Sequence, residues 1–180
     1  TVTALWSELT VPEQADWNAI AATVTRKNRL GETYVPTGRQ IFMEINNTML
    51  ASSQAAIMAA PLDLNPPAIG ESTPVATIEV DGGNAFSSFT ITGLPTVSAR
   101  MVIDATPPLT TPKNNVQNLY RNVLSDGAAT SANVQAGYIA LFGGLANPGN
   151  YIYLRVRYFK STNGIFSTPI ELSGLIEEEA

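Results

Sequence analysis

Apolar residues near the start of the chain follow the period of an amphipathic helix. In "ELTVPEQADWNAIAATV" they recur at i, i+3, i+4 and i+7 and therefore share one face: Trp17, Ile20, Ala21 and Val24. Thr10 and Glu13 have the spacing of a capping box, and Pro12 stands in the first turn, where its missing N–H costs little. Basic residues and a glycine in "TRKNRLGE" then predict the end of this helix.

A second helical pattern begins at "PTGRQIFMEINNTML". Thr37 and Gln40 repeat the capping spacing, and the apolar residues after them share one face: Phe42, Ile45 and Met49. Trp6 and Trp17 are the large side chains of this region and are candidate anchors, either in a core or at an interface. Two such short helices are too few for a core of their own, so we expect them to dock on the more C-terminal part of the chain.

The pattern changes after residue 60. Four prolines in residues 61–74 predict a linker, and short β-prone runs separated by turn residues come after it. The seven predicted strands are 75–80, 87–92, 99–105, 118–124, 134–142, 151–159 and 166–173. The sequence therefore predicts a helical segment at 1–60, a Pro-rich linker at 61–74, a β-sandwich domain at 75–175 and an acidic tail at 176–180. The fold class is mainly β.

The end of the chain carries a family pattern. A leucine and a Pro-Gly turn precede a tyrosine-bearing strand, and a Ser-Thr-Pro segment starts the closing strand: Leu145, Pro148, Gly149, Tyr151 or Tyr153, Arg155-Val156-Arg157 and Ser167-Thr168-Pro169. This resembles a fibronectin type III or related immunoglobulin-like domain. The resemblance implies a seven-stranded antiparallel sandwich in which the third, fourth, sixth and seventh strands share one sheet.

Alternation along residues 151–159 assigns the two faces of the predicted sixth strand. Its more apolar face should meet the core: Ile152, Leu154, Val156 and Tyr158. Its other face carries Tyr151, Tyr153, Arg155 and Arg157, and on the third strand Arg100 and Asp104 should point outward beside them. Arg and Tyr are enriched at interface anchors, so this Arg–Tyr face is a candidate contact surface. The alternative is a solvated face whose arginines pair locally with Asp104 or Glu171.

The composition argues against catalysis. The chain has neither cysteine nor histidine, which excludes a disulfide, a thiolate nucleophile and an imidazole base. The acidic residues that could form a catalytic pair are Glu79, Asp81, Asp104 and Asp126, and two of them, Asp81 and Asp126, stand beside glycines, where turn geometry alone favours Asp. No calcium-loop or phosphate-loop motif occurs. We expect no enzyme activity, no cofactor and no metal.

Charge and hydropathy limit the partners. A net charge of −5 argues against general nucleic-acid binding, and no apolar run approaches the roughly 18 residues of a membrane span. Only 14% of the residues are charged, which is common in proteins that pack against copies of themselves. The terminal Glu177, Glu178 and Glu179 are either a solvated tail or a group that docks on the Arg–Tyr face of a neighbouring copy.

The sequence supports two functions from different classes. The first is a non-catalytic structural protein that assembles with copies of itself or with another structural protein, as a virion component or an extracellular filament or surface subunit. The alternative is an adhesion module that binds a protein or glycan through sandwich loops or the Arg–Tyr face. Both place the protein in a virion or at the cell surface.

Overall fold

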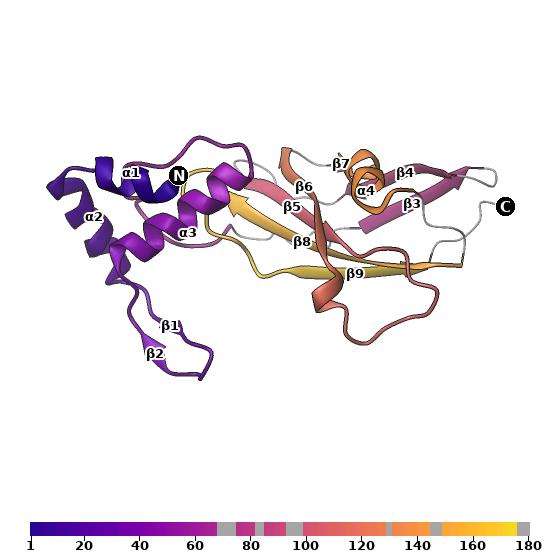
Figure 1. Ribbon diagram of the computed structural model, residues 1–180, viewed down its shortest axis with the longest axis horizontal. Coiled ribbons are helices and arrows are strands. Elements are labelled where there is room, and N and C mark those ends of the chain that lie inside the picture. The colour runs from indigo at the N-terminus through magenta and orange to yellow at the C-terminus, as the bar shows by residue number, and fades with distance from the viewer. Residues whose placement is uncertain (68–74, 82–84, 93–98, 129–130, 145–148, 176–180) are drawn as a thin grey trace. The chain divides into compact units, whose positions relative to one another are not determined.

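A computed structural model of the chain describes residues 1–67, 75–81, 85–92, 99–128, 131–144 and 149–175 (Figure 1). The chain divides into two compact units. Residues 1–66 and 160–165 form the first, which we call the helical unit. Residues 67–159 and 166–180 form the second, which we call the sheet unit.

The helical unit contains three helices and a small hairpin: α1 (Val2–Glu8), α2 (Val11–Ala21), β1 (Arg26–Lys27), β2 (Thr33–Tyr34) and α3 (Gly38–Ala51) (Figure 1). Both predicted capping boxes are confirmed, because Thr10 with Glu13 and Thr37 with Gln40 close the first turns of α2 and α3. The Glu13 carboxylate accepts hydrogen bonds from the Thr10 backbone N–H and hydroxyl, both at 2.7 Å, and these hydrogen bonds lower the pKa of Glu13.

The helical unit has a core of its own. Trp17 and Phe42 are fully buried and meet edge to face with ring centroids 5.1 Å apart, and Trp6 contacts the same Phe42 ring at 5.3 Å. A Cβ at Gly38 would lie 2.6 Å from the Asn18 backbone nitrogen, so only glycine lets α3 approach α2 this closely. The expectation that the helical segment lacks an independent core is wrong, because α1 adds a third helix to the two that were predicted.

A turn from the far end of the chain completes this unit. Asn163 is buried, and its side-chain amide donates to the backbone oxygens of Asp63 at 3.3 Å and Asn65 at 2.9 Å. Its side-chain oxygen accepts from the backbone N–H of Ile165 at 3.1 Å. Lys160 adds an ion pair to Asp63 at 3.8 Å.

The sheet unit contains two antiparallel sheets. One has the order β3-β4-β7, from β3 (Val75–Asp81), β4 (Ala85–Thr92) and β7 (Ser131–Asn133). The other has the order β6-β5-β8-β9, from β5 (Ala99–Ala105), β6 (Arg121–Ala128), β8 (Tyr151–Lys160) and β9 (Ile170–Leu175). A short 3₁₀ helix, η1 (Gln117–Leu119), precedes β6, and α4 (Gln135–Phe142) comes after β7. The four-stranded sheet thus contains the third, fourth, sixth and seventh predicted strands.

The predicted mainly β, seven-stranded sandwich is wrong, because the described residues form four α-helices alongside strands of three separate sheets. The clearest local error is the strand predicted at 134–142, where the chain forms α4. Gly137 lies against the backbone carbonyl of Val123, where a Cβ would collide, so α4 packs directly on β6. Gly143 then ends the helix in a left-handed conformation, with φ of 75°.

The described core of the sheet unit lies between α4 and one face of the four-stranded sheet. Alternating residues of β8 supply it, as predicted: Ile152, Leu154, Val156 and Tyr158. Met101, Ile103 and Ala105 of β5 join them, together with the fully buried ring of Tyr138 from α4. Burial raises the pKa of Tyr158 to about 12 and raises that of Tyr138 as well.

Candidate interaction surfaces

The Arg–Tyr face lies on β8 opposite the core, and its side chains are half-buried: Tyr151, Tyr153, Arg155 and Arg157. Arg100 is also half-buried and pairs with Ala128 of β6 across the strand register. The predicted alternation of β8 is therefore confirmed. Whether this face binds a partner stays a prediction.

Asp104 holds this face together. Arg155 donates to Asp104 Oδ2 from Nε at 3.1 Å and from Nη2 at 3.0 Å, and Arg157 donates to the same oxygen from Nη2 at 2.9 Å. Asn122 donates to Oδ1 at 3.3 Å. Only 4% of Asp104 is exposed, so the expectation that it points into solvent is wrong. The local pairing that we considered as the alternative is present, with Asp104 as the partner of both arginines.

The connection between β5 and β6 covers part of the same face. The backbone N–H of Lys113 donates to the Tyr153 hydroxyl at 2.9 Å, and Gln117 joins Arg155 at 3.3 Å to Glu171 at 3.0 Å. The Arg155 guanidinium also stacks on the Tyr120 ring, 4.5 Å from its centroid. Burial is the main cause that raises the pKa of Tyr120, and the nearby Glu171 carboxylate adds to it.

Arg157 is held in a similar way, because its guanidinium lies 4.6 Å from the centroid of the Phe166 ring. Each arginine of β8 therefore has an aromatic ring and a carboxylate from its own chain. Much of the hydrogen-bonding capacity of the two arginines is therefore used within the sheet unit, whereas Arg157 Nε has no hydrogen-bond partner among the described residues.

The other predicted contact residues lie in different places. Trp17 is fully buried, and its ring nitrogen donates to the Met58 carbonyl at 2.8 Å, so it serves the core of the helical unit. Trp6 is half-buried on α1 beside Phe42. Glu177, Glu178 and Glu179 lie outside the described residues. The tryptophans therefore belong to the helical unit, and the Arg–Tyr face belongs to the sheet unit.

The hairpin formed by β1 and β2 is a surface that sequence reasoning missed. Residues 27–35 are all exposed, and three apolar side chains lie among them: Leu30 at 84%, Tyr34 at 42% and Val35 at 55%. Its base is tied to α3 by an ion pair between Arg26 and Glu44 at 3.0 Å. Figure 1 shows the hairpin extending away from the helices of its own unit.

Asn28 shapes the tip of the hairpin. Its side-chain oxygen accepts from the backbone N–H groups of Leu30 and Glu32, both at 2.9 Å, and its amide donates to the Glu32 carboxylate at 2.7 Å. Gly31 takes a positive φ of 83° at the turn. Leu30 is thus presented to solvent on a pre-formed turn. Asn28 and Gly31 were the sequence signal for it, but the "TRKNRLGE" stretch was interpreted as the end of α2, which in fact ends at Ala21.

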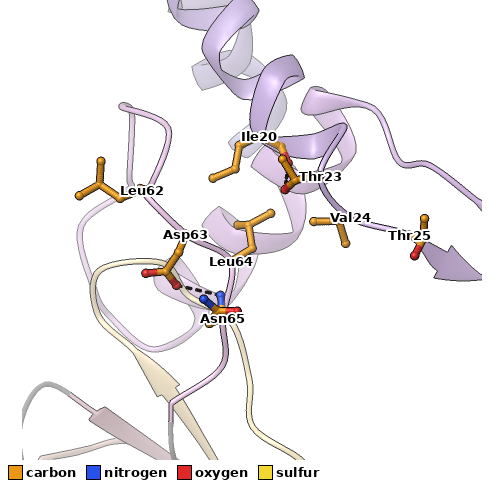
Figure 2. A pocket seen from close by; sticks show the side chains of 8 residues that line it. All are labelled: Ile20, Thr23, Val24, Thr25, Leu62, Asp63, Leu64 and Asn65. Carbon is orange, nitrogen blue, oxygen red and sulfur yellow. Dashed lines mark hydrogen bonds between the residues drawn. The ribbon is translucent and has the colours of Figure 1, made fainter.

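A hollow of about 440 Å³ lies in the helical unit between the end of α2 and the segment after Pro61 (Figure 2). Asp63 is the one charged residue that lines it, and its carboxylate accepts from the Asn65 backbone N–H at 2.8 Å. The Thr23 hydroxyl donates to the Ile20 carbonyl at 2.7 Å. These polar groups are engaged by local turns and by the 160–165 turn, through Lys160 and Asn163, and they form no convergent set that would bind a ligand.

No protein-family model matches the chain, and no curated protein matches it. Within the described ranges, no group of three or more acidic side chains is placed to hold a metal ion. The helices in the described part of the chain are all too short or too polar to cross a bilayer.

Proposed function

We propose that this protein is a non-catalytic structural protein that assembles with copies of itself, as a virion component or a subunit of an extracellular filament or surface layer. The observation that carries the proposal is the hairpin tip, where an ordered turn holds Leu30 at 84% exposure. A pre-formed apolar tip is suited to a contact, because little conformational freedom is lost when it binds.

The energetics support a contact at this tip. Covering a leucine or valine side chain contributes about 1.5–3 kcal/mol relative to leaving it in water. Lys27 and Arg29 flank the tip and are exposed. Such charges keep an exposed strand pair from indiscriminate aggregation, while allowing a partner of opposite charge to bind.

The interior of the protein supports a structural role. The buried carboxylate of Asp104 has both oxygens engaged by side chains of its own chain, so it is committed to holding strands together. Trp17 is likewise engaged in the core through its ring and its N–H. The chain also lacks the histidine and cysteine that most nucleophilic mechanisms use.

Sedimentation velocity over a wide range of protein concentrations tests the proposal. We expect wild-type protein to form larger species as concentration rises, and Leu30→Ser to weaken this association by about tenfold or more. Leu62→Ser is the matched control, because Leu62 is fully exposed in the same unit but lies outside the hairpin. A wild-type protein that stays monomeric throughout would overturn the proposed function. If the two substitutions weaken association equally, the hairpin is not the surface that makes the contact.

A further inference from the structure

The outward side of α2 is unusually apolar for an exposed helix. Four of its exposed residues are apolar, namely Val11, Pro12, Ala15 and Ala19, and Asp16 is the one charged residue among the exposed positions of this helix. Val11 alone is 81% exposed. A helix that is apolar on both its buried and its outward sides is normally covered on both. We call these five residues the outer face of α2.

Charge is segregated along the helical unit. Residues 1–24 contain Glu8, Glu13 and Asp16 and no basic residue, whereas residues 25–39 contain four basic residues and only Glu32 as an acid. Lys27 and Arg29 form no ion pair within the described part of the chain, and the same holds for Glu8 and Asp16. The hairpin and the outer face of α2 are therefore complementary in both charge and apolar character.

The outer face runs along α2 from Val11 to Ala19, and the hairpin begins after the last residue of this helix, Ala21. Glu8 precedes the first turn of α2, and a helix of this length is about 16 Å long, so its charge is weakly coupled to the hairpin at physiological salt, where the screening length is about 8 Å. Asp16 lies nearer to the hairpin in sequence, but it forms no ion pair with Lys27 or Arg29 of its own copy. The complementary charges are therefore available to pair between two copies.

We infer that the hairpin of one copy docks on the outer face of α2 in the next copy. Leu30, Tyr34 and Val35 cover the apolar residues of α2, while Lys27 and Arg29 meet Asp16 and Glu8. The inference rests on the proposed self-assembly and names the surface that receives the hairpin. If each copy receives the hairpin of a different neighbour, the contact is heterologous, and repetition gives a ring when the rotation closes and a filament when it does not, whereas reciprocal docking between two copies gives a closed two-fold dimer.

Charge reversal tests the pairing directly. One variant carries Lys27→Glu with Arg29→Glu, and the other carries Glu8→Lys with Asp16→Lys. Arg26 and Glu13 are left intact, because they hold the hairpin base and cap α2. Each variant alone should associate at least about tenfold more weakly than wild type, because like charges then face each other. An equal mixture should recover association to within about threefold of wild type, since each variant complements the other. Association is measured by sedimentation velocity, and folding by circular dichroism.

The outcomes separate the two claims. If wild type associates and the Glu8→Lys, Asp16→Lys variant associates equally well, α2 is not the receiving surface, although self-assembly stands. Failure of the mixture to recover, with both variants folded, overturns the pairing as well. A wild type that never associates overturns the proposed function itself. Should a reversal variant fail to fold, alanine at the same four positions in a double-mutant cycle gives the coupling between the two surfaces, and zero coupling overturns the inference.

Discussion

Arg155 on β8 and Asp104 on β5 are 51 residues apart in sequence, yet Nε and Nη2 of the arginine lie 3.1 and 3.0 Å from one carboxylate oxygen. Arg157 adds a third donor to this oxygen at 2.9 Å. A buried carboxylate needs such compensation, because removal from water costs several kcal/mol. The basic residues of β8 are thus counterions for a buried acid, which explains why a strand on an acidic protein carries two arginines.

Replacement of Asp104 by asparagine tests this relationship. The change removes the charge that compensates two guanidinium groups, and we expect the free energy of unfolding to fall by about 2 kcal/mol. Urea denaturation monitored by fluorescence measures it. Glu171→Gln is the control, because Glu171 is exposed and should change stability by less than about 0.5 kcal/mol. If both substitutions lower the free energy of unfolding by the same amount, the buried ion pairs of Asp104 contribute no more to stability than the contacts of the exposed Glu171.

Tyr158 should make the protein sensitive to alkali. Burial raises its pKa from 10.0 to about 12, so between these pH values the unfolded chain loses the phenolic proton while the folded chain keeps it. Ionisation of this group therefore leaves stability unchanged below pH 10 and lowers it as the pH rises from 10 towards 12. Tyr158→Phe should therefore reduce the loss of stability over this range, as measured by urea titrations at several pH values.

Tyr158→Phe should also change the free energy of unfolding at neutral pH. The Tyr158 hydroxyl is buried and has no hydrogen-bond partner among the described residues. Its removal should stabilise the protein by about 1 kcal/mol. Destabilisation of similar size would mean that the hydroxyl has a partner.

Gly137 should be essential for the contact of α4 with β6. A Cβ at this position would collide with the carbonyl of Val123, so we expect Gly137→Ala to lower the free energy of unfolding by about 2 kcal/mol or more. Gly144→Ala is the matched control, because nothing lies within 4 Å of the added methyl group. Differential scanning calorimetry measures both. A neutral Gly137→Ala would contradict the direct packing of this helix on the strand.

Salt should weaken the proposed assembly. The screening length falls from about 10 Å at 0.1 M to about 3 Å at 1 M, which reduces attraction between exposed charges such as Lys27 and Asp16. We expect smaller species in sedimentation velocity as sodium chloride rises. A contact made by apolar side chains alone would be unaffected or strengthened. Growth of the assembly with salt would therefore count against the charged part of the contact.

Local signals in the sequence predicted several elements well. The capping boxes located α2 and α3, because side chains within one turn decide where a helix begins. Alternation along β8 identified its core face. This strand pairs with β5 on one side and β9 on the other, so its register is fixed and successive side chains point to opposite faces of the sheet. These features depend on residues that are close together in the chain.

The errors concern features that depend on distant residues. The apolar run of α4 has no clear period, and only its contact with Val123 makes the helical form evident. Asp104 was expected in solvent because alternation alone does not reveal that the 106–120 connection crosses that face. The hairpin tip is an exception, because its contacts are local, but its signal, Asn28 and Gly31 in "TRKNRLGE", also fits the C-terminal end of a helix.

The turn at residues 160–165 sets an order of events during synthesis. Asn163 supplies the amide that the carbonyls of Asp63 and Asn65 accept, and it is made about 100 residues after them. A growing chain that has just emerged through Pro66 therefore holds the three helices but not the segment that closes them. The helical unit is therefore completed only after all of β8 has been made, so a fragment cut after Pro66 should melt at a lower temperature than the same residues in the full chain.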